Sequence, residues 1–256
     1  MRRYGVTVAS YTWTMLGELV EAPAHPGERY HPVRLFIGSG MPRGLWRRVL
    51  RRFRPAQVLE FYASTEAGAI LVNLAGVKVG AMGRPLPGSA EVRLAAFDLE
   101  RGGLELRTDG FARECRAEEV GMLMARAALA EHTTTIPLRG VFERDDAWLM
   151  TGDLFRRERD GDYWRVGHLG EVIRTGAGPV LPGPIRDALG ELDAVELAVA
   201  YGVRPDRSDH EVPLAAVTLR AGRQLTAAEV TGALAPLPAE GRPTVVLIVD
   251  EIPLTT

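Results

Sequence analysis

Residue types that often carry chemistry are scarce in this chain of 256 residues. Cys115 is the single cysteine, so a disulfide or a thiolate cluster cannot form within one chain. The 5 histidines lack the spacing of metal ligands, and Lys78 is the only lysine, so arginine supplies almost all of the positive charge. A disulfide scaffold and a zinc site are therefore excluded, and we expect Cys115 to be an inert, small hydrophobic residue.

Long apolar runs and excess charge are also missing. No apolar stretch approaches the 18 residues of a membrane-spanning helix, and we expect no signal peptide before the fold. The net charge of −2 gives no indication of a nucleic-acid partner. With 46% hydrophobic and 25% charged residues, the composition predicts a globular protein with a core, which we expect in the cytoplasm.

The first part of the chain alternates between strand and helix patterns. Strand-like segments at Val6–Ser10, Val33–Ile37 and Gln57–Phe61 are separated by a helical segment at Thr12–Val20 and another that begins near Pro42. This rhythm predicts a parallel sheet that binds ligands at its strand ends.

The helix that follows Pro42 has two distinct faces. One face carries Trp46, Val49, Leu50 and Phe53 at helical spacing, which predicts burial. The other face carries five arginines: Arg43, Arg47, Arg48, Arg51 and Arg52. We expect these arginines to be solvated, and a contact with a partner or a membrane surface is the alternative.

A different rhythm begins near Leu71. Short strands separated by glycine- and proline-rich turns predict a small β-barrel or a twisted antiparallel layer, and a loop with Thr133-Thr134-Thr135 lies within this region. The tail of roughly 85 residues predicts a compact α+β unit. In that unit Thr226 and Glu229 have the spacing of a helix capping box, and Thr244–Val249 has the pattern of a final strand.

Two segments have residues suited to a nucleotide. Phe61–Glu66 predicts a strand that runs into a turn of small residues, where Tyr62 offers an aromatic face and Thr65 a hydroxyl. Glu66 adds a carboxylate of the kind that binds Mg²⁺ beside phosphate oxygens. Thr151-Gly152-Asp153 offers a second carboxylate on a tight turn, which suits the two hydroxyls of a ribose.

Glycines after the second strand leave another interpretation open. Gly38-Ser39-Gly40 and Gly44 follow a strand and open a helix, and Glu60 ends the next strand. This arrangement imitates the fingerprint of a Rossmann-type dinucleotide-binding module, although the third glycine is one residue late.

The order of several motifs resembles the adenylate-forming superfamily, which includes the acyl-CoA synthetases. The motifs are Tyr62-Ala63-Ser64-Thr65-Glu66, Gly83-Arg84-Pro85-Leu86-Pro87-Gly88, Thr151-Gly152-Asp153-Leu154, Gly167–Arg174 and the final run Val249–Thr256. The resemblance covers nearly the whole chain but only the later half of such an enzyme. Asp153–Arg156 together with Asp160–Trp164 is most similar to long- and very-long-chain fatty acyl-CoA synthetases.

The resemblance implies a mixed α/β fold in two parts. Residues 1–169 would form an incomplete large domain, with a parallel sheet and a small barrel-like β layer. Residues 170–256 would form a small, mobile α+β domain that ends before the lysine expected of the family, with a hinge at Gly170.

The resemblance also implies a chemistry and its residues. A fatty acid or another carboxylate would react with ATP to give an acyl-adenylate, and coenzyme A or a carrier-protein thiol would then displace AMP. Thr65 and Glu66 would be catalytic, with Thr65 on phosphate oxygens and Glu66 on Mg²⁺. The nucleotide would further contact Tyr62 of the same segment, on the adenine, and residues from three other segments: Gly38, Ser39 and Gly40, Asp153 on the ribose, and His168.

Departures from the family pattern limit the expected activity. Nothing before Glu60 resembles the phosphate loop of the family, and no lysine follows Lys78. His168 stands where relatives have an arginine that contacts the ribose. We therefore expect a fragment or a degenerate member that is not fully active alone; the alternatives are a non-catalytic adenylate-binding or interaction protein and the Rossmann-type module.

Overall fold

A computed structural model describes residues 2–127 and 136–253. The threonine loop at 133–135 and the last three residues of the final motif lie outside the described residues. The helices and strands follow in the order β1 (Val8–Tyr11), α1 (Trp13–Glu21), β2 (Leu35–Gly38), α2 (Arg43–Arg52), β3 (Gln57–Ser64), β4 (Ala69–Val72), β5 (Arg84–Pro85), β6 (Val92–Asp98), β7 (Gly103–Leu104), β8 (Val120–Arg126), β9 (Leu138–Arg139), β10 (Ala147–Arg157), β11 (Tyr163–His168), β12 (Ile173–Thr175), β13 (Gly178–Val180), α3 (Pro182–Gly190), β14 (Val195–Val203), β15 (Val212–Leu219), α4 (Ala227–Leu234) and β16 (Val245–Ile248). Short 3₁₀ turns lie at Arg2–Tyr4, Glu28–Tyr30, Leu169–Glu171 and Ala239–Gly241.

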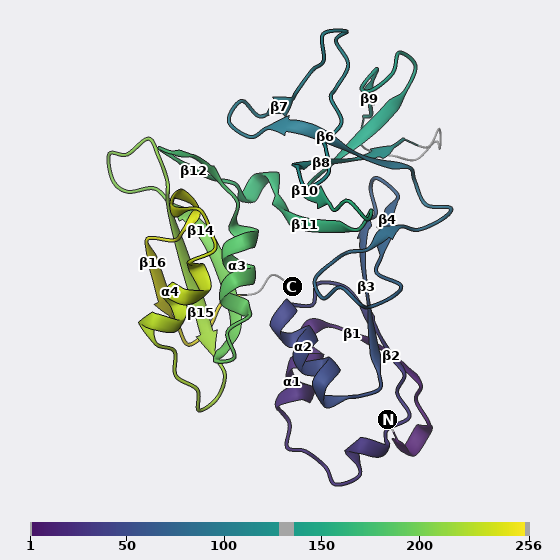
Figure 1. Cartoon of the computed structure of the whole chain (residues 1–256), viewed down its shortest axis with the longest axis vertical. Helices are drawn as coiled ribbons and strands as arrows, with labels where there is room; N and C mark the ends of the chain where they lie inside the picture. The colour runs from purple at the N-terminus through teal and green to yellow at the C-terminus, as the bar shows by residue number, and fades with distance from the viewer. Residues whose placement is uncertain (1, 128–135, 254–256) are drawn as a thin grey trace.

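The first sheet has the strand order β1-β2-β3-β4-β5. Strands β1, β2 and β3 are parallel, as the sequence predicts, and β4 returns antiparallel to β3. Helices α1 and α2 pack against this sheet through a shared cluster that includes Leu16, Phe36 and Trp46 (Figure 1). Thr12 is the N-cap of α1 and accepts a hydrogen bond from the Met15 backbone N–H at 3.3 Å.

The prediction of a solvated arginine face on α2 is wrong at two positions. Arg48 is only 9% exposed and lies 3.9 Å from Glu21 of α1. Arg52 donates to the Glu28 carboxylate and to the carbonyl oxygens of Val20 and Ala22. The end of α1 and the segment after it therefore cover this face, and an arginine with five donors can cap their free carbonyls.

The second sheet is antiparallel, with the open order β11-β10-β8-β6-β7 and β9 beside β10. Its two faces bury separate apolar clusters, one built around Tyr62 and Phe155 and the other around Trp148 and Met122. The antiparallel layer that the sequence offered as one of two choices is thus the one observed.

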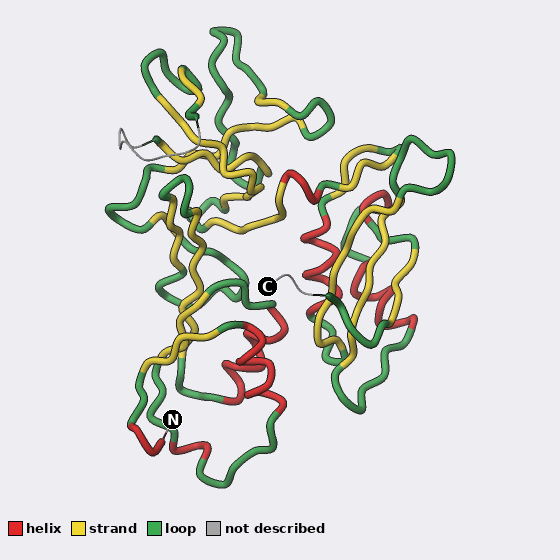
Figure 2. Tube along the Cα trace, turned by 180° about the vertical axis from the view of Figure 1, so that it is seen from behind, coloured by secondary structure: helices red, strands yellow, loops and turns green. Residues whose placement is uncertain are grey.

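A third body is formed by β12 to β16 with α3 and α4, and it lies beside the two sheets (Figures 1 and 2). Its core is a separate cluster that includes Ile173, Ile185 and Val217. Thr226 and Glu229 form the predicted capping box, each accepting from the backbone N–H of the other. The 3₁₀ turn Leu169–Glu171, which contains the predicted domain boundary, joins this body to β11. None of the helices among the described residues has the length and apolar character needed to cross a bilayer.

Candidate functional site

Strand β3 presents the first candidate segment. The strand continues to Ser64, which pairs with Ala69 of β4, and residues 65–68 form the turn between them. Thr65 and Glu66 are exposed on this turn, and within the described part of the chain neither side chain has a hydrogen bond or ion pair. The hydroxyl and carboxylate are therefore available to a ligand, and the catalytic role of both residues stays a prediction.

The Thr151-Gly152-Asp153 segment is a bulge in β10. Pairing with β8 is interrupted between Met150 and Leu154, so these three residues leave the ladder. The Thr151 hydroxyl donates to the Leu123 carbonyl at 2.9 Å and accepts from the Asp153 backbone N–H at 3.1 Å. Gly152 has a φ of +78°, a conformation that disfavours any side chain, and the bulge re-aims Asp153 toward β3.

Asp153 joins the two candidate segments. Its Oδ2 accepts from the Tyr62 hydroxyl at 2.7 Å, and its Oδ1 accepts from Arg165 at 2.7 and 2.9 Å. The Tyr62 ring is 8% exposed and packs edge-on against Phe155, with 4.9 Å between centroids. Burial, followed by the neighbouring Asp153 carboxylate, raises the pKa of Tyr62, so its proton stays in this bond. The ring is thus mostly a core element, and its predicted stacking on adenine stays a prediction.

His168 lies directly across from Asp153 in the β10–β11 pair. Its Nδ1 accepts from the Gly170 backbone N–H at 3.1 Å, and Glu171 accepts from the His168 backbone N–H at 3.2 Å. A Cβ on Gly152 would lie 2.6 Å from His168 Nε2, so the ring faces the bulge. His168 therefore caps the turn at the predicted hinge, and Gly170 is an exposed residue within that turn.

The Gly38-Ser39-Gly40 turn borders a pocket of about 610 Å³ at the ends of β1 and β2. Tyr11, Trp13, Ile37 and Phe61 give the pocket largely apolar walls. The adjoining residue on β3 after Phe61 is Tyr62, so this pocket and the Asp153 carboxylate flank the same strand.

The Rossmann-type interpretation fails at its two decisive residues. Glu60 is 0% exposed and accepts from the Tyr11 hydroxyl and the Met41 backbone N–H, so a ribose-binding role for it is wrong. A Cβ on Gly44 would collide with the Gly190 carbonyl oxygen of α3, so this glycine serves helix packing rather than phosphate approach.

Two features of the site escaped sequence reasoning. Arg165 of β11 orients the candidate ribose carboxylate, and no sequence motif assigns it a role. The buried contact between Tyr11 and Glu60 joins residues 49 positions apart, and no local pattern indicates it.

Glu66 is the side chain to consider for a bound metal ion. No group of three His, Cys, Asp or Glu residues that could hold a metal occurs in residues 2–127 and 136–253. A single exposed carboxylate beside a threonine suits Mg²⁺, which commonly takes one or two carboxylates together with substrate phosphates and waters.

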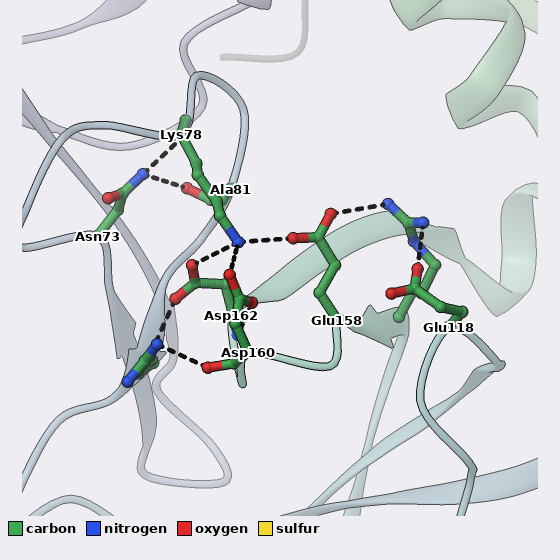
Figure 3. A network of polar contacts seen from close by, with 9 residues as sticks. Asn73, Lys78, Ala81, Glu118, Glu158, Asp160 and Asp162 are labelled. Carbon is green, nitrogen blue, oxygen red and sulfur yellow. Dashed lines mark hydrogen bonds and ion pairs between the residues drawn. The ribbon is translucent and has the colours of Figure 1, made fainter.

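The only lysine has other partners. Lys78 forms ion pairs with Glu158 at 2.7 Å, with Asp162 at 3.0 Å and with Asp160 (Figure 3). Asn73 donates to the Lys78 and Ala81 carbonyls and so shapes the loop that carries the lysine. Lys78 therefore ties this loop to the β10–β11 hairpin and does not enter the candidate site.

Known proteins resemble the chain over nearly its whole length. A family described as "AMP-binding enzyme" matches residues 1–105. Long-chain fatty acid transport protein 6 of Mus musculus is 28% identical over 99% of the chain, and the medium/long-chain-fatty-acid–CoA ligase FadD6 of Mycobacterium tuberculosis is 29% identical over 80%. The anthranilate CoA ligase AuaEII, solved in complex with anthranoyl-AMP, superposes with a TM-score of 0.73 over 99% of the chain at 21% identity.

The chain is shorter than these proteins. It spans 43% of the mouse transport protein, 35% of FadD6 and 48% of the solved ligase.

Proposed function

Because the chain belongs to the adenylate-forming superfamily, close to the long-chain fatty acyl-CoA synthetases, we propose that it supplies the adenylate-binding cleft of an ATP-dependent acyl-CoA ligase. The substrate would be a fatty acid, activated as its acyl-adenylate and transferred to coenzyme A. The observation that carries the proposal is the convergence of Tyr62 and Asp153, 91 positions apart in sequence, on one hydrogen bond of 2.7 Å.

Asp153 is suited to the ribose because its direction is already fixed. Tyr62 donates once to Oδ2 and Arg165 contacts Oδ1 through two nitrogens, so one of the about four acceptor sites of the carboxylate is left, on Oδ2. One ribose hydroxyl can therefore donate to Asp153 without displacing either partner.

Thr65 and Glu66 would face the phosphate from the neighbouring turn. Mg²⁺ held by Glu66 supplies charge neutralisation for the phosphate oxygens when it is bound. The Thr65 hydroxyl, exposed beside it, would donate to a phosphate oxygen. Both assignments rest on the resemblance and on the exposed, unpaired state of these side chains among the described residues.

The apolar pocket next to Gly38 would take the start of the acyl chain. It lies against the turn proposed to flank the adenine, and its volume of about 610 Å³ is in the range of small-molecule sites. An acyl-adenylate analogue such as dodecanoyl sulfamoyl-adenosine presents both parts at once.

Calorimetry with this analogue tests the proposal. We expect the wild-type chain to bind it and Asp153→Asn to bind about tenfold more weakly, the cost of about one charge-assisted hydrogen bond. Asp109→Asn, an exposed carboxylate paired only with Arg107 and its own turn, is the matched control and should bind like the wild type. The proposal fails if the wild type does not bind, and the ribose assignment fails if Asp153→Asn binds equally well.

A second candidate function is a binding protein without turnover. The observation that favours it is Lys78, the only lysine of the chain, which is held by three carboxylates and does not reach the cleft. An ATP–pyrophosphate exchange assay on this chain tests this second candidate, because robust exchange would contradict it.

A further inference from the structure

A row of three residues crosses the parallel sheet at the edge of the apolar pocket. In the strand register Tyr11 lies beside Gly38, and Gly38 lies beside Glu60. Gly38 has no side chain, and a Cβ there would lie 2.7 Å from the Tyr11 ring. The Tyr11 ring therefore occupies the space over Gly38, and its hydroxyl reaches across β2 to the Glu60 carboxylate.

Glu60 also holds the turn that follows β2. Its Oε1 accepts from the Met41 backbone N–H at 3.0 Å, and the Gly40 backbone N–H adds a further hydrogen bond. One carboxylate thus fixes a wall of the pocket, through Tyr11, and the end of the turn whose first residues, Gly38 and Ser39, line it.

We propose that Glu60 is a positioning residue that closes this pocket, with Tyr11 and the turn of residues 38–41 as its two arms. The residue touches no ligand itself and acts through the groups it holds. The proposal deepens the proposed function, because the pocket would receive the acyl-adenylate.

Glu60, Tyr11 and the turn of residues 38–41 together form what we call the clasp, and we expect its closure to depend on pH. Burial raises the pKa of Glu60 to about 7, and the hydrogen bonds from Tyr11, Met41 and Gly40 only partly oppose this. Tyr11 of β1 is the titratable group that faces the carboxylate. Strand β2 presents Gly38, the turn presents backbone N–H groups, and the Asn73 backbone N–H after β4 donates to the Glu60 backbone carbonyl. Above pH 7 the ionised Glu60 carboxylate accepts hydrogen bonds from all of these donors. Below pH 7 the protonated carboxyl group has less acceptor capacity, so it loses its hydrogen bond either to Tyr11 or to the turn.

The first experiment needs no ligand. Trp13 lines the same pocket, so its fluorescence is expected to titrate with a midpoint near pH 7 in the wild type. Glu60→Gln should abolish this titration, Tyr11→Phe should move it to higher pH because a bond that stabilises the carboxylate is lost, and Glu240→Gln, an exposed control, should leave it unchanged. Trp13→Phe should remove the pH-dependent change in fluorescence, which would show that the change comes from Trp13.

The second experiment measures the pocket itself. Between pH 8 and pH 6 the wild type is expected to lose about tenfold in affinity for dodecanoyl sulfamoyl-adenosine, the loss of about one charge-assisted hydrogen bond. Glu60→Gln should bind at both pH values with the weaker affinity, a result that a purely structural residue would not give.

The outcomes separate the clasp from the proposed function. Unchanged Trp13 titration in Glu60→Gln overturns the clasp, and so does equal affinity of Glu60→Gln and wild type at pH 8. If the wild type does not bind the analogue at any pH, the proposed function fails, and the Trp13 titration alone then decides whether the clasp exists. If Glu60→Gln does not fold, the direction of the midpoint shift in Tyr11→Phe gives the decision.

Discussion

At the scale of single residues, the candidate site depends on side chains that are fixed before any ligand arrives. Tyr62 and Arg165 hold the Asp153 carboxylate from two strands, and the β10 bulge fixes its backbone. A carboxylate held in this way loses little conformational entropy on binding, which favours affinity.

Tyr62→Phe tests the central bond of this arrangement. The change removes one hydroxyl from a ring that is 8% exposed and leaves Asp153 with Arg165 alone. We expect the free energy of unfolding to fall by about 1–2 kcal/mol, because the hydrogen bond has a charged acceptor. Urea unfolding measures the change, and Tyr30→Phe, on a ring that is 63% exposed, should alter it by less than about 0.5 kcal/mol.

Some of these residues could be predicted from the sequence and others could not. Tyr62 and Asp153 stand in motifs whose residue types already indicate a nucleotide. The role of Glu60 could not be predicted, because its partner Tyr11 is reached only through the strand register and the missing side chain of Gly38. A glycine near a turn indicates a flexible backbone conformation. The sequence does not show which neighbouring side chain occupies the space that a larger residue would fill.

At the scale of elements, the turn before β10 is organised by one buried carboxylate. Asp146 is 6% exposed and accepts from the backbone N–H groups of Val141, Phe142 and Glu143 and from Trp148 Nε1, at 2.7–2.9 Å. Burial alone would raise the pKa of Asp146, but these four donors together hold the pKa below its ordinary value.

Asp146→Asn is expected to lower the free energy of unfolding by about 2–3 kcal/mol near pH 7. The amide replaces one acceptor oxygen by an NH2 group, which then faces N–H groups that need an acceptor. A carboxyl whose pKa is lowered in the folded state stabilises the fold above its unfolded pKa, and this stabilisation is lost as pH falls through the folded value. The difference between Asp146→Asn and wild type should therefore shrink below about pH 4. Urea titrations at several pH values measure it. The exposed neighbour Asp145→Asn is the control, and a constant difference across the pH range would contradict the assignment.

Elements were predictable where local pattern decides them. Thr12 and Thr226 begin helices as expected, since a cap needs only its own turn. The burial of Arg48 was not predictable, because it depends on where α1 and the residues after it pack.

At the scale of the whole molecule, helices α2 and α3 join the body of β12–β16 to the rest of the chain (Figure 1). Arg47 pairs with Glu191 at 2.8 Å and Arg43 with Asp187 at 3.4 Å. These pairs are partly exposed, so each contributes little and weakens with salt. Gly44 allows the close approach, because its Cα faces the Gly190 carbonyl directly.

Gly44→Ala tests whether this approach sets the shape of the molecule. In an isolated helix an alanine would stabilise α2 by up to about 1 kcal/mol, but here its Cβ collides with the Gly190 carbonyl and must push α3 away. We expect a larger radius of gyration by small-angle X-ray scattering, with a greater increase at high salt because the ion pairs are then screened. Gly17→Ala in α1, where a Cβ meets nothing within 4 Å, is the matched control and should leave the scattering unchanged. Identical scattering from Gly44→Ala and wild type at both salt concentrations would mean that the α2–α3 contact does not hold the two bodies in this arrangement.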